Sequence, residues 1–490
     1  MQKPVTRRWT AAVVALFSAC AAIAASAVIA SFGASQQPAV SGPSSTSVFD
    51  PARTAFVVTD GAGGELPGCG AISAIDTLTG EVLYQSPRRG SRSDLAAAED
   101  FSLFASGGGA GGDKRMYLLD AGAASPDEWA VRVFWSPAGP RQLNGSATAI
   151  LNGDLYFGLH GGFEEGFGLG RVPLDRIEDT PDLQDVNPVE AVYSLRQLHL
   201  IQILPDPDGR HLHLLAQESR TPTSPTDVVE TQALQIHTVD TTIMAARVAP
   251  QVLPPLVVSE PPGAGLREVG IHNWLQNGRL AYMTLLPAGA GGGPRDRWVA
   301  VNRLVAPEIS FANIRGGSRE AVTASLPADF TLAGAVAANH GWHNPGLLAV
   351  HGGDKVAVFD MDPLEGLLHE RSRIDITPVV SSLLDDGRMM PGRIAWSADG
   401  SQLIVAGNEG TAEVLILDVG ACGDTLTLRH VVTVCPYAEY NGLAGIVTAN
   451  GSLPPPAPSP EACPTPFWMP EPWPVGSPFS LALPWVSAGG

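Results

Sequence analysis

Lysine is nearly absent from this chain of 490 residues, which contains only Lys3, Lys114 and Lys355 and takes its other bases from arginine. Acids outnumber bases by 49 to 30, and the formal net charge is −19. A protein with that balance repels polyanions, so nucleic acid is not expected as a partner. The shortage of lysine, together with abundant alanine, glycine and proline, is typical of a GC-rich genome and indicates a bacterial source.

The chain also lacks the short motifs of several enzyme and cofactor classes. It contains no CxxC and no CxxCH, which excludes a thioredoxin-type site and a c-type haem. No GxSxG, no Ser/His/Asp arrangement and no paired carboxylates stand out, and neither a P-loop nor a dinucleotide fingerprint is present. The sequence therefore assigns no catalytic residue and no cofactor-binding residue, and it favours a non-enzymatic protein.

Helical periodicity is not sustained beyond the N-terminal segment. Residues 1–34 begin with three bases, and the uncharged stretch WTAAVVALFSACAAIAASAVIASF follows. This stretch is long enough to span a membrane as a hydrophobic helix, while Ala25-Ser26-Ala27 offers a cleavage site and Phe17-Ser18-Ala19-Cys20 loosely resembles a lipoprotein box. We predict a signal peptide or membrane anchor at 1–34. Each alternative leaves the rest of the protein extracytoplasmic, either anchored to the cytoplasmic membrane or secreted.

Few cysteines are available for disulfides in such an exported protein. Beyond the targeting segment they are Cys69, Cys422, Cys435 and Cys463. Four cysteines permit three pairings, and the sequence does not choose among them.

A sequence repeat made of two parts recurs along the rest of the chain. Its first part is an apolar run, a turn containing Asp, Asn or Gly, and a second apolar run. The copies are VFDPARTAFVV (48–58), AAEDFSLFAS (97–106), AILNGDLYFGL (149–159), ILPDPDGRHLHLL (203–215), HNWLQNGRLAYMTLL (272–286), WHNPGLLAVHG (342–352) and IAWSADGSQLIVAG (394–407). Its second part is a strand-like run that closes on Asp76, Asp120, Asp175, Asp240, Asn302, Asp360 or Asp418.

Each copy indicates four short antiparallel strands joined by tight turns, in which Gly supplies positive φ and Asp or Asn bonds to its own backbone. One such sheet cannot bury both of its faces, so neighbouring copies must stack. Seven copies in a fixed order predict an all-β fold, a seven-bladed β-propeller of four-stranded antiparallel blades, preceded by the N-terminal hydrophobic helix. The seven closing acids and amide are expected at equivalent places around the ring.

VFDPARTAFVV and AIDTLTGEVL resemble repeats of the YVTN-type and WD-repeat-like (WD40-like) propellers of bacterial exported proteins. The resemblance covers about residues 45–449 and implies the fold more than any activity. AIDTLTGEVLY also resembles the quinoprotein propeller motif, with Tyr84 where that family has Trp. It occurs once rather than in every blade, which counts against a quinone cofactor.

The remaining segments complete the domain organisation. We predict a linker at 35–47, the propeller at 48–449, and a tail rich in Pro and Trp at 450–490. Because Pro cannot donate a backbone hydrogen bond, the tail is not expected to form an interior strand. LAGIVTA (443–449) resembles the beginning of a further copy of the repeat, but the rest of that copy is missing. We expect this strand to close the ring by pairing in the first or last blade, because an open ring leaves strand edges exposed.

Glycine-rich segments are the candidate binding loops. They are GAGGELPGCG (61–70), GGGAGGDK (107–114), GGFEEGFGLG (161–170) and PAGAGGGPRD (287–296), each expected to join the second and third strands of a blade. Glycine lets the backbone approach a ligand closely. A protein or small-molecule ligand is therefore expected on this loop face, although plain solvated insertions explain the same composition.

Histidines supply the candidate metal site. His340 and His343 lie in ANHGWHNPG, with His351 nearby, and loop imidazoles can share a divalent metal, as lactonase-like exported propellers bind one near the central channel. No acid accompanies them locally, so ordinary turn and core histidines are the competing interpretation. His211 and His213 alternate along a strand and are expected to pack in its wall.

These observations favour an exported, membrane-tethered propeller that serves as a binding or scaffold module. The first alternative is a metal-dependent, lactonase-like hydrolase with its site at the central channel. Three or more converging acid, Asn or His side chains at the channel mouth favour that enzyme. A quinoprotein-like oxidoreductase is the second alternative. No cofactor is expected unless the channel holds a divalent metal.

Overall fold

A computed structural model of the protein describes residues 49–451. Excepted are residues 60–68, 88–93, 108–114, 136–141, 164–165, 178–189, 197, 219–233, 245–255, 259–280, 288–296, 304–305, 316–320, 331–334, 353–354, 377–392, 407–412 and 436–442. The N-terminal segment, the linker and residues 452–490 of the predicted tail lie outside the described residues. In the part that is described, no helix is long and apolar enough to cross a membrane.

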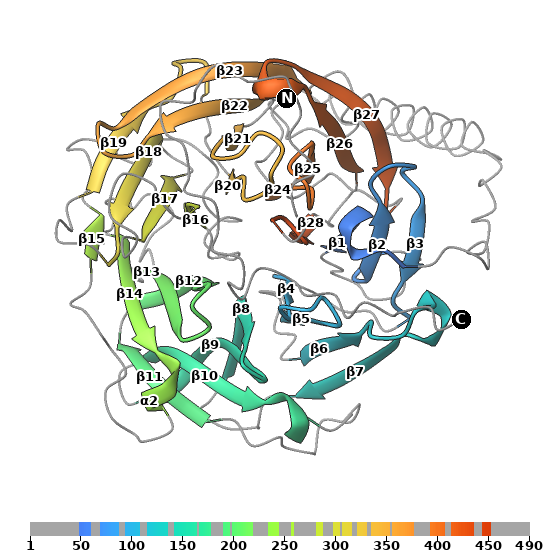
Figure 1. Cartoon of the computed structure of the whole chain (residues 1–490). Coiled ribbons are helices and arrows are strands. Elements are labelled where there is room, and N and C mark those ends of the chain that lie inside the picture. Colours follow the sequence, from blue (N-terminus) through green and yellow to red (C-terminus); the bar gives the residue numbers. More distant parts are fainter. Residues whose placement is uncertain are drawn as a thin grey trace, which may run out of the picture. The chain divides into compact units, whose positions relative to one another are not determined.

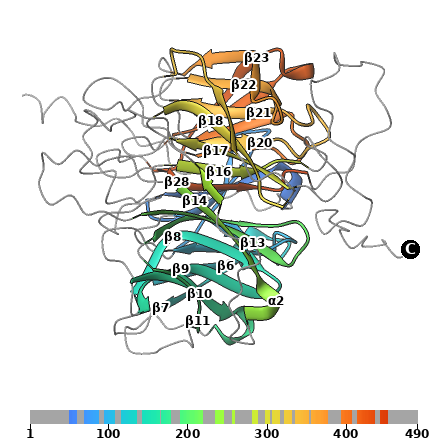
Figure 2. The same cartoon turned by 90° about the vertical axis from the view of Figure 1, so that its left-hand side faces the viewer.

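Seven four-stranded antiparallel sheets are arranged as blades around a ring (Figure 1), which Figure 2 shows from the side. The seven-bladed β-propeller predicted from the repeats is confirmed. From the centre outward, the closing blade contains β28 (Leu443–Thr448), β1 (Thr54–Thr59), β2 (Ile72–Asp76) and β3 (Val82–Gln85). Blade 2 contains β4 (Ala96–Ala97), β5 (Leu103–Gly107), β6 (Arg115–Asp120) and β7 (Ala130–Trp135). Blade 3 contains β8 (Gln142–Leu151), β9 (Asp154–Phe163), β10 (Gly166–Pro173) and β11 (Glu190–Arg196).

The other four blades follow the same order around the ring. Blade 4 contains β12 (Leu198–Pro205), β13 (His211–Glu218), β14 (Leu234–Asp240) and β15 (Leu256–Val258). Blade 5 contains β16 (Ala281–Leu285), β17 (Trp298–Arg303), β18 (Ala306–Asn313) and β19 (Ala321–Ser325). Blade 6 contains β20 (Val336–Ala338), β21 (Leu348–Gly352), β22 (Lys355–Asp362) and β23 (Leu367–Asp375). Blade 7 contains β24 (Arg393–Trp396), β25 (Gln402–Ala406), β26 (Glu413–Val419) and β27 (Leu426–Thr433).

Helical structure is confined to single turns in the described part of the chain. These are the 3-10 turns η1 (Pro51–Arg53), η2 (Pro126–Glu128), η3 (Leu174–Arg176) and η5 (Ala421–Gly423), and the four-residue α2 (Thr241–Met244).

The hydrophobic core is divided among the seven interfaces between neighbouring blades. Alternate residues of β1 show why: Phe56 packs towards blade 2 with Phe104 and Trp129, whereas Ala55 and Val57 pack towards blade 7. Side chains of a strand point alternately to its two faces, so every blade is apolar on both. This explains why the predicted strands are continuous apolar runs instead of alternating patterns.

Aspartates close many of the turns, as the sequence predicted. The Asp76 carboxylate accepts the N–H of Leu78 at 2.8 Å, and Asp399 accepts that of Ser401 at 2.9 Å. These contacts are Asx turns, in which a side chain replaces a backbone acceptor. Among the blade-end aspartates, Asp120 and Asp240 close turns in the same way as Asp76. Asp360 and Asp418 instead pair with arginines of the outermost strand, Arg371 and Arg429.

In blade 5, the predicted position of the closing residue is wrong. Asn302 lies in β17, the second strand of its blade, whereas the other six residues lie in the third strand or directly after it. Asn313 ends the third strand and accepts the N–H of Arg315 at 3.1 Å, in the turn-closing role expected of Asn302. The cause is that the run read as a second strand, around Ala281–Leu285, is the innermost strand β16.

The ring is closed by the C-terminal strand, as predicted. β28 pairs antiparallel with β1, with Ala55 opposite Thr448 and Val58 opposite Gly445. A Cβ on Gly445 would lie 2.7 Å from the backbone nitrogen of Leu95, so glycine is needed for this close approach to blade 2. The closing blade therefore combines its innermost strand, from the C-terminal end of the propeller sequence, with three strands from the N-terminal end.

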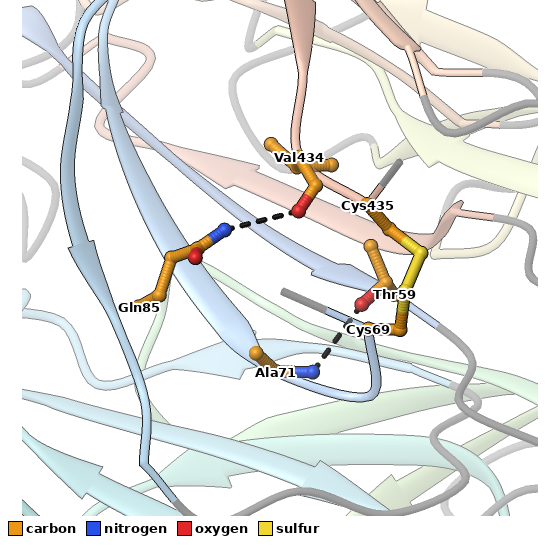
Figure 3. The surroundings of a disulfide bond; sticks show 6 residues. All are labelled: Thr59, Cys69, Ala71, Gln85, Val434 and Cys435. Carbon is orange, nitrogen blue, oxygen red and sulfur yellow. Dashed lines mark hydrogen bonds between the residues drawn. A yellow bond between two sulfur atoms is a disulfide. The ribbon is translucent and has the colours of Figure 1, made fainter. Parts of the chain in front are cut away.

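A disulfide joins the closing blade to blade 7 (Figure 3). Cys69, just before β2, bonds to Cys435, just after β27, with a Cα–Cα distance of 4.9 Å. Beside it, Gln85 Nε2 donates to the carbonyl oxygen of Val434 at 3.0 Å. Of the three pairings that the sequence permits, the structure selects the one that contains Cys69–Cys435.

Candidate functional site

The innermost strands of the seven blades surround a central channel with a cavity of about 410 Å³. Small side chains keep it open: Ala97, Ala98 and Ala395 line it and are only partly buried. Ile446 and Val447 of β28 line the same wall and are also only partly buried. The cavity is thus a mostly apolar space with a few polar groups, the usual composition of a small-molecule site.

One region of the cavity wall carries an ion pair. Arg393, the first residue of β24, donates from its guanidinium to the Asp94 carboxylate at 3.1 Å, and both side chains are 12% exposed. The Arg393 guanidinium also lies over the ring of Tyr282 on β16, 4.7 Å from its centroid. Asp94 accepts the backbone N–H of Thr148 on β8 at 3.3 Å. Residues from three other blades therefore fix this arginine in place.

The wall at the ends of β20 and β28 carries amides and a histidine. Asn450 accepts the backbone N–H of His340 at 2.7 Å and donates to Asn339 Oδ1 at 3.1 Å and to Ser397 O at 2.6 Å. The ring Nε2 of His340 lies 3.0 Å from the carbonyl oxygen of Leu285. Burial lowers the pKa of His340 to about 4, although this hydrogen bond opposes the shift. The imidazole is therefore neutral at pH 7.

Other polar side chains of the wall bridge neighbouring innermost strands. Gln202 on β12 donates to the Met283 carbonyl at 2.9 Å and accepts the Met283 N–H at 2.8 Å. Thr284 on β16 accepts the N–H of Ala338 on β20 at 3.1 Å. These bonds satisfy backbone groups at the inner edges of blades 5 and 6, where no further strand pairs.

The three histidines of the predicted metal site do not form a cluster. His340 lies beside the channel, His343 packs edge-on against Trp342 with ring centroids 5.5 Å apart, and His351 is fully buried in β21. Among the described residues, no group of three or more His, Cys, Asp or Glu side chains is placed to hold a metal ion. The geometry gives the metal prediction no support.

A hydrogen-bonded array that the sequence did not reveal lies in blade 4. His213 Nε2 lies 2.9 Å from Asp206 Oδ2, and its Nδ1 lies 3.1 Å from Thr238 Oγ1. The order hydroxyl, imidazole, carboxylate is that of a hydrolase triad. All three residues are at most 1% exposed, so the Thr238 hydroxyl cannot reach a substrate. We interpret the array as structural.

Two arginines of blade 5 complete this array. Arg297 Nε lies 3.3 Å from Asp206 Oδ1, and Arg315 lies 3.4 Å from Asp206 Oδ2 and also pairs with Asp208. Burial alone would raise the pKa of Asp206, but His213 and the two arginines outweigh it and hold that pKa below its usual value. Burial lowers the pKa of His213, against the pull of Asp206. The array is therefore an ionic clamp between blades 4 and 5.

GAGGELPGCG and GGGAGGDK join second and third strands, as expected. GGFEEGFGLG lies at the same place in blade 3, but it is a loop only at 164–165, because its other residues belong to β9 and β10. The fourth, PAGAGGGPRD, follows β16 and so joins the first strand of blade 5 to the second. Most of these loops lie outside the described residues. The binding role predicted for them remains a prediction.

The quinoprotein-like motif has a structural explanation in this chain. The Tyr84 ring packs edge-on against Trp129, with centroids 5.0 Å apart, in the interface between the closing blade and blade 2.

Sequence comparisons assign no family: no family model and no curated protein matches the chain. Solved structures do match its fold. The periplasmic gluconolactonase of Pseudomonas aeruginosa has a TM-score of 0.50 at 17% identity, over 80% of this chain and 99% of that one. A protein of unknown function from Desulfotomaculum acetoxidans has a TM-score of 0.50 at 12% identity, over 80% and 99%. At these identities, the likeness shows the propeller fold alone.

Proposed function

We propose that this propeller is a binding module for a small organic molecule with an apolar body and a polar end, held in the central channel. The observation that carries the proposal is the cavity of about 410 Å³ with its alanine-rich wall. Sites for small molecules usually occupy about 300–1,000 Å³ and combine apolar walls with a few fixed polar groups. Arg393, Asp94 and Tyr282 are such groups.

Filling the channel tests this proposal. Ala395→Phe and Ala97→Phe add a ring where partly buried alanines line the cavity. Val431→Phe is the control, because Val431 is 44% exposed on the outermost strand β27. Saturation-transfer NMR with cyclohexanecarboxamide should show a signal for the wild type and the control, and at least a severalfold weaker one for the two filled variants. Equal signals for all four proteins would refute binding in the channel.

A lactone-hydrolysing enzyme is the second candidate, favoured by the shared fold with a protein named as a gluconolactonase. Incubation with D-glucono-1,5-lactone, with and without Zn²⁺ or Mg²⁺, separates this candidate from the binding module. Hydrolysis above the spontaneous rate that disappears in Ala395→Phe would establish the enzyme.

We further propose that the protein is exported and is either anchored to the membrane or secreted. The Cys69–Cys435 disulfide supports an oxidising compartment, where such bonds persist. Fractionation and N-terminal sequencing test both parts. A membrane-bound chain that retains residues 1–34 indicates an anchor, whereas a mature terminus at Val28 indicates cleavage. A reduced protein in the cytoplasm would contradict the proposal.

A further inference from the structure

The ion pair in the channel also bears on the charge of the ligand. Arg393 is the basic residue among the described residues that line the cavity, and Asp94 neutralises it at 3.1 Å. Asp206 touches the same cavity, but it is compensated by His213, Arg297 and Arg315. The charges of Arg393 and Asp94 therefore cancel each other, and that of Asp206 is cancelled by its own partners, before any ligand enters.

The remaining acid of the lining stands apart from these two. Glu99 lies in the turn between β4 and β5 and is exposed, so water screens its charge. It adds negative potential at the edge of the cavity and offers no counter-charge to an anion.

A balanced pair disfavours ionic ligands. Moving a charged group out of water is unfavourable unless a counter-charge compensates it. A carboxylate at Arg393 would compete with Asp94, and an ammonium group at Asp94 would compete with Arg393. A neutral group such as an amide or a cyclic ester can accept from the guanidinium and leave the pair intact.

We propose that Arg393 and Asp94 together select a neutral ligand that carries a hydrogen-bond acceptor. This inference rests on the proposed function, because it requires that the ligand occupies the channel. Tyr282 supports the selection by holding the guanidinium over its ring, so that the donors keep one orientation. Arg393 and Asp94 act as specificity-determining residues.

Three probes of matched size test the selection: cyclohexanecarboxamide, cyclohexanecarboxylate and cyclohexylmethylammonium. The wild type should bind the carboxamide about tenfold more tightly than either ion. Asp94→Asn keeps an acceptor for the Thr148 N–H and leaves the arginine uncompensated, so it should bind the carboxylate best. Arg393→Gln should bind the ammonium probe best. The double variant should again prefer the carboxamide.

Surface charge changes provide the matched controls. Asp329 and Arg373 form an ion pair at 2.5 Å, with side chains 46% and 37% exposed. Asp329→Asn and Arg373→Gln should leave the order of the three probes unchanged. Unfolding curves for every variant establish that it is folded before affinities are compared.

The outcomes separate the two proposals. A wild type that binds the carboxylate or the ammonium probe at least as tightly as the carboxamide, in a manner blocked by Ala395→Phe, overturns the charge selection and leaves channel binding standing. Unchanged probe order in both single variants also overturns it. Binding of none of the probes to any variant overturns the proposed function, and this inference with it.

Discussion

Single residues hold neighbouring blades together through buried charge, and Asp206 is the clearest case. We expect Asp206→Asn to lower the free energy of unfolding by about 3 kcal/mol or more, because removing one partner of a buried ionic group leaves the others uncompensated. His213, Arg297 and Arg315 are the partners that lose the negative charge of Asp206. Urea titration measures the effect.

Asp362→Asn is the control for this change. Asp362 only closes a turn, by accepting the N–H groups of Leu364 and Glu365 at 3.0 and 3.1 Å. If Asp206→Asn loses no more stability than Asp362→Asn, the array is not a clamp.

Buried histidines predict that the protein loses stability in mild acid. Burial lowers the pKa of His237 to about 4 and that of His340 to about 4, below an unfolded value of about 6.5. Between these values the unfolded chain binds more protons, so stability rises with pH and is lost as the pH falls from 6.5 towards 4. Each histidine contributes at most about 1.4 kcal/mol per pH unit.

Denaturation at pH 7, 6 and 5 measures this slope. His237→Gln should reduce this slope by the equivalent of up to one proton taken up on unfolding. The matched control is His369→Gln, because His369 is exposed. An equal slope in the wild type and His237→Gln would contradict the assignment.

The sequence revealed residues whose partners are local. An aspartate that closes a turn bonds to an N–H two residues later, as Asp76 does with Leu78, so the motif itself contains both partners. Arg393 and Asp94 are separated by 299 positions. A charged residue opening an innermost strand was the available signal for Arg393, but the partner follows only from the closed ring.

At the scale of strands, apolar runs between turn residues predicted all seven blades and gave the right strand positions in six of them. Blade 5 was misassigned because HNWLQNGRLAYMTLL matches two strands, whereas β16 is its Ala281–Leu285 portion and is the innermost strand. Repeats fix the number of blades, but not which run of a blade lies at the centre. That position depends on packing against strands of other blades.

The closing strand β28 yields a prediction at the same scale. A chain ending after Ala438 lacks β28, whereas one ending after Ser452 keeps it. The shorter chain should lose more than the roughly 1 kcal/mol of an ordinary substitution, because β1 loses its partner and the apolar faces beside it open. Equal melting temperatures of the two chains would show that β28 does not close the ring.

For the whole molecule, the structure limits how the four cysteines beyond residues 1–34 can pair. Cys422 also takes part in a disulfide. With Cys69 bonded to Cys435, the remaining cysteine of the predicted exported chain is Cys463. The pairing of Cys422 with Cys463 is therefore expected.

The ring as a whole is held at one seam by two devices, the Cys69–Cys435 disulfide and the innermost strand β28. Cys69 and Cys435 are 366 positions apart, and replacing both by Ser should cost about 2–4 kcal/mol. Because both devices join blade 7 to the closing blade, their losses should be coupled. The double Cys→Ser change should therefore destabilise the chain that ends after Ala438 more than the chain that ends after Ser452. Urea denaturation of the four proteins measures the coupling, and strictly additive losses would show that the two devices act independently.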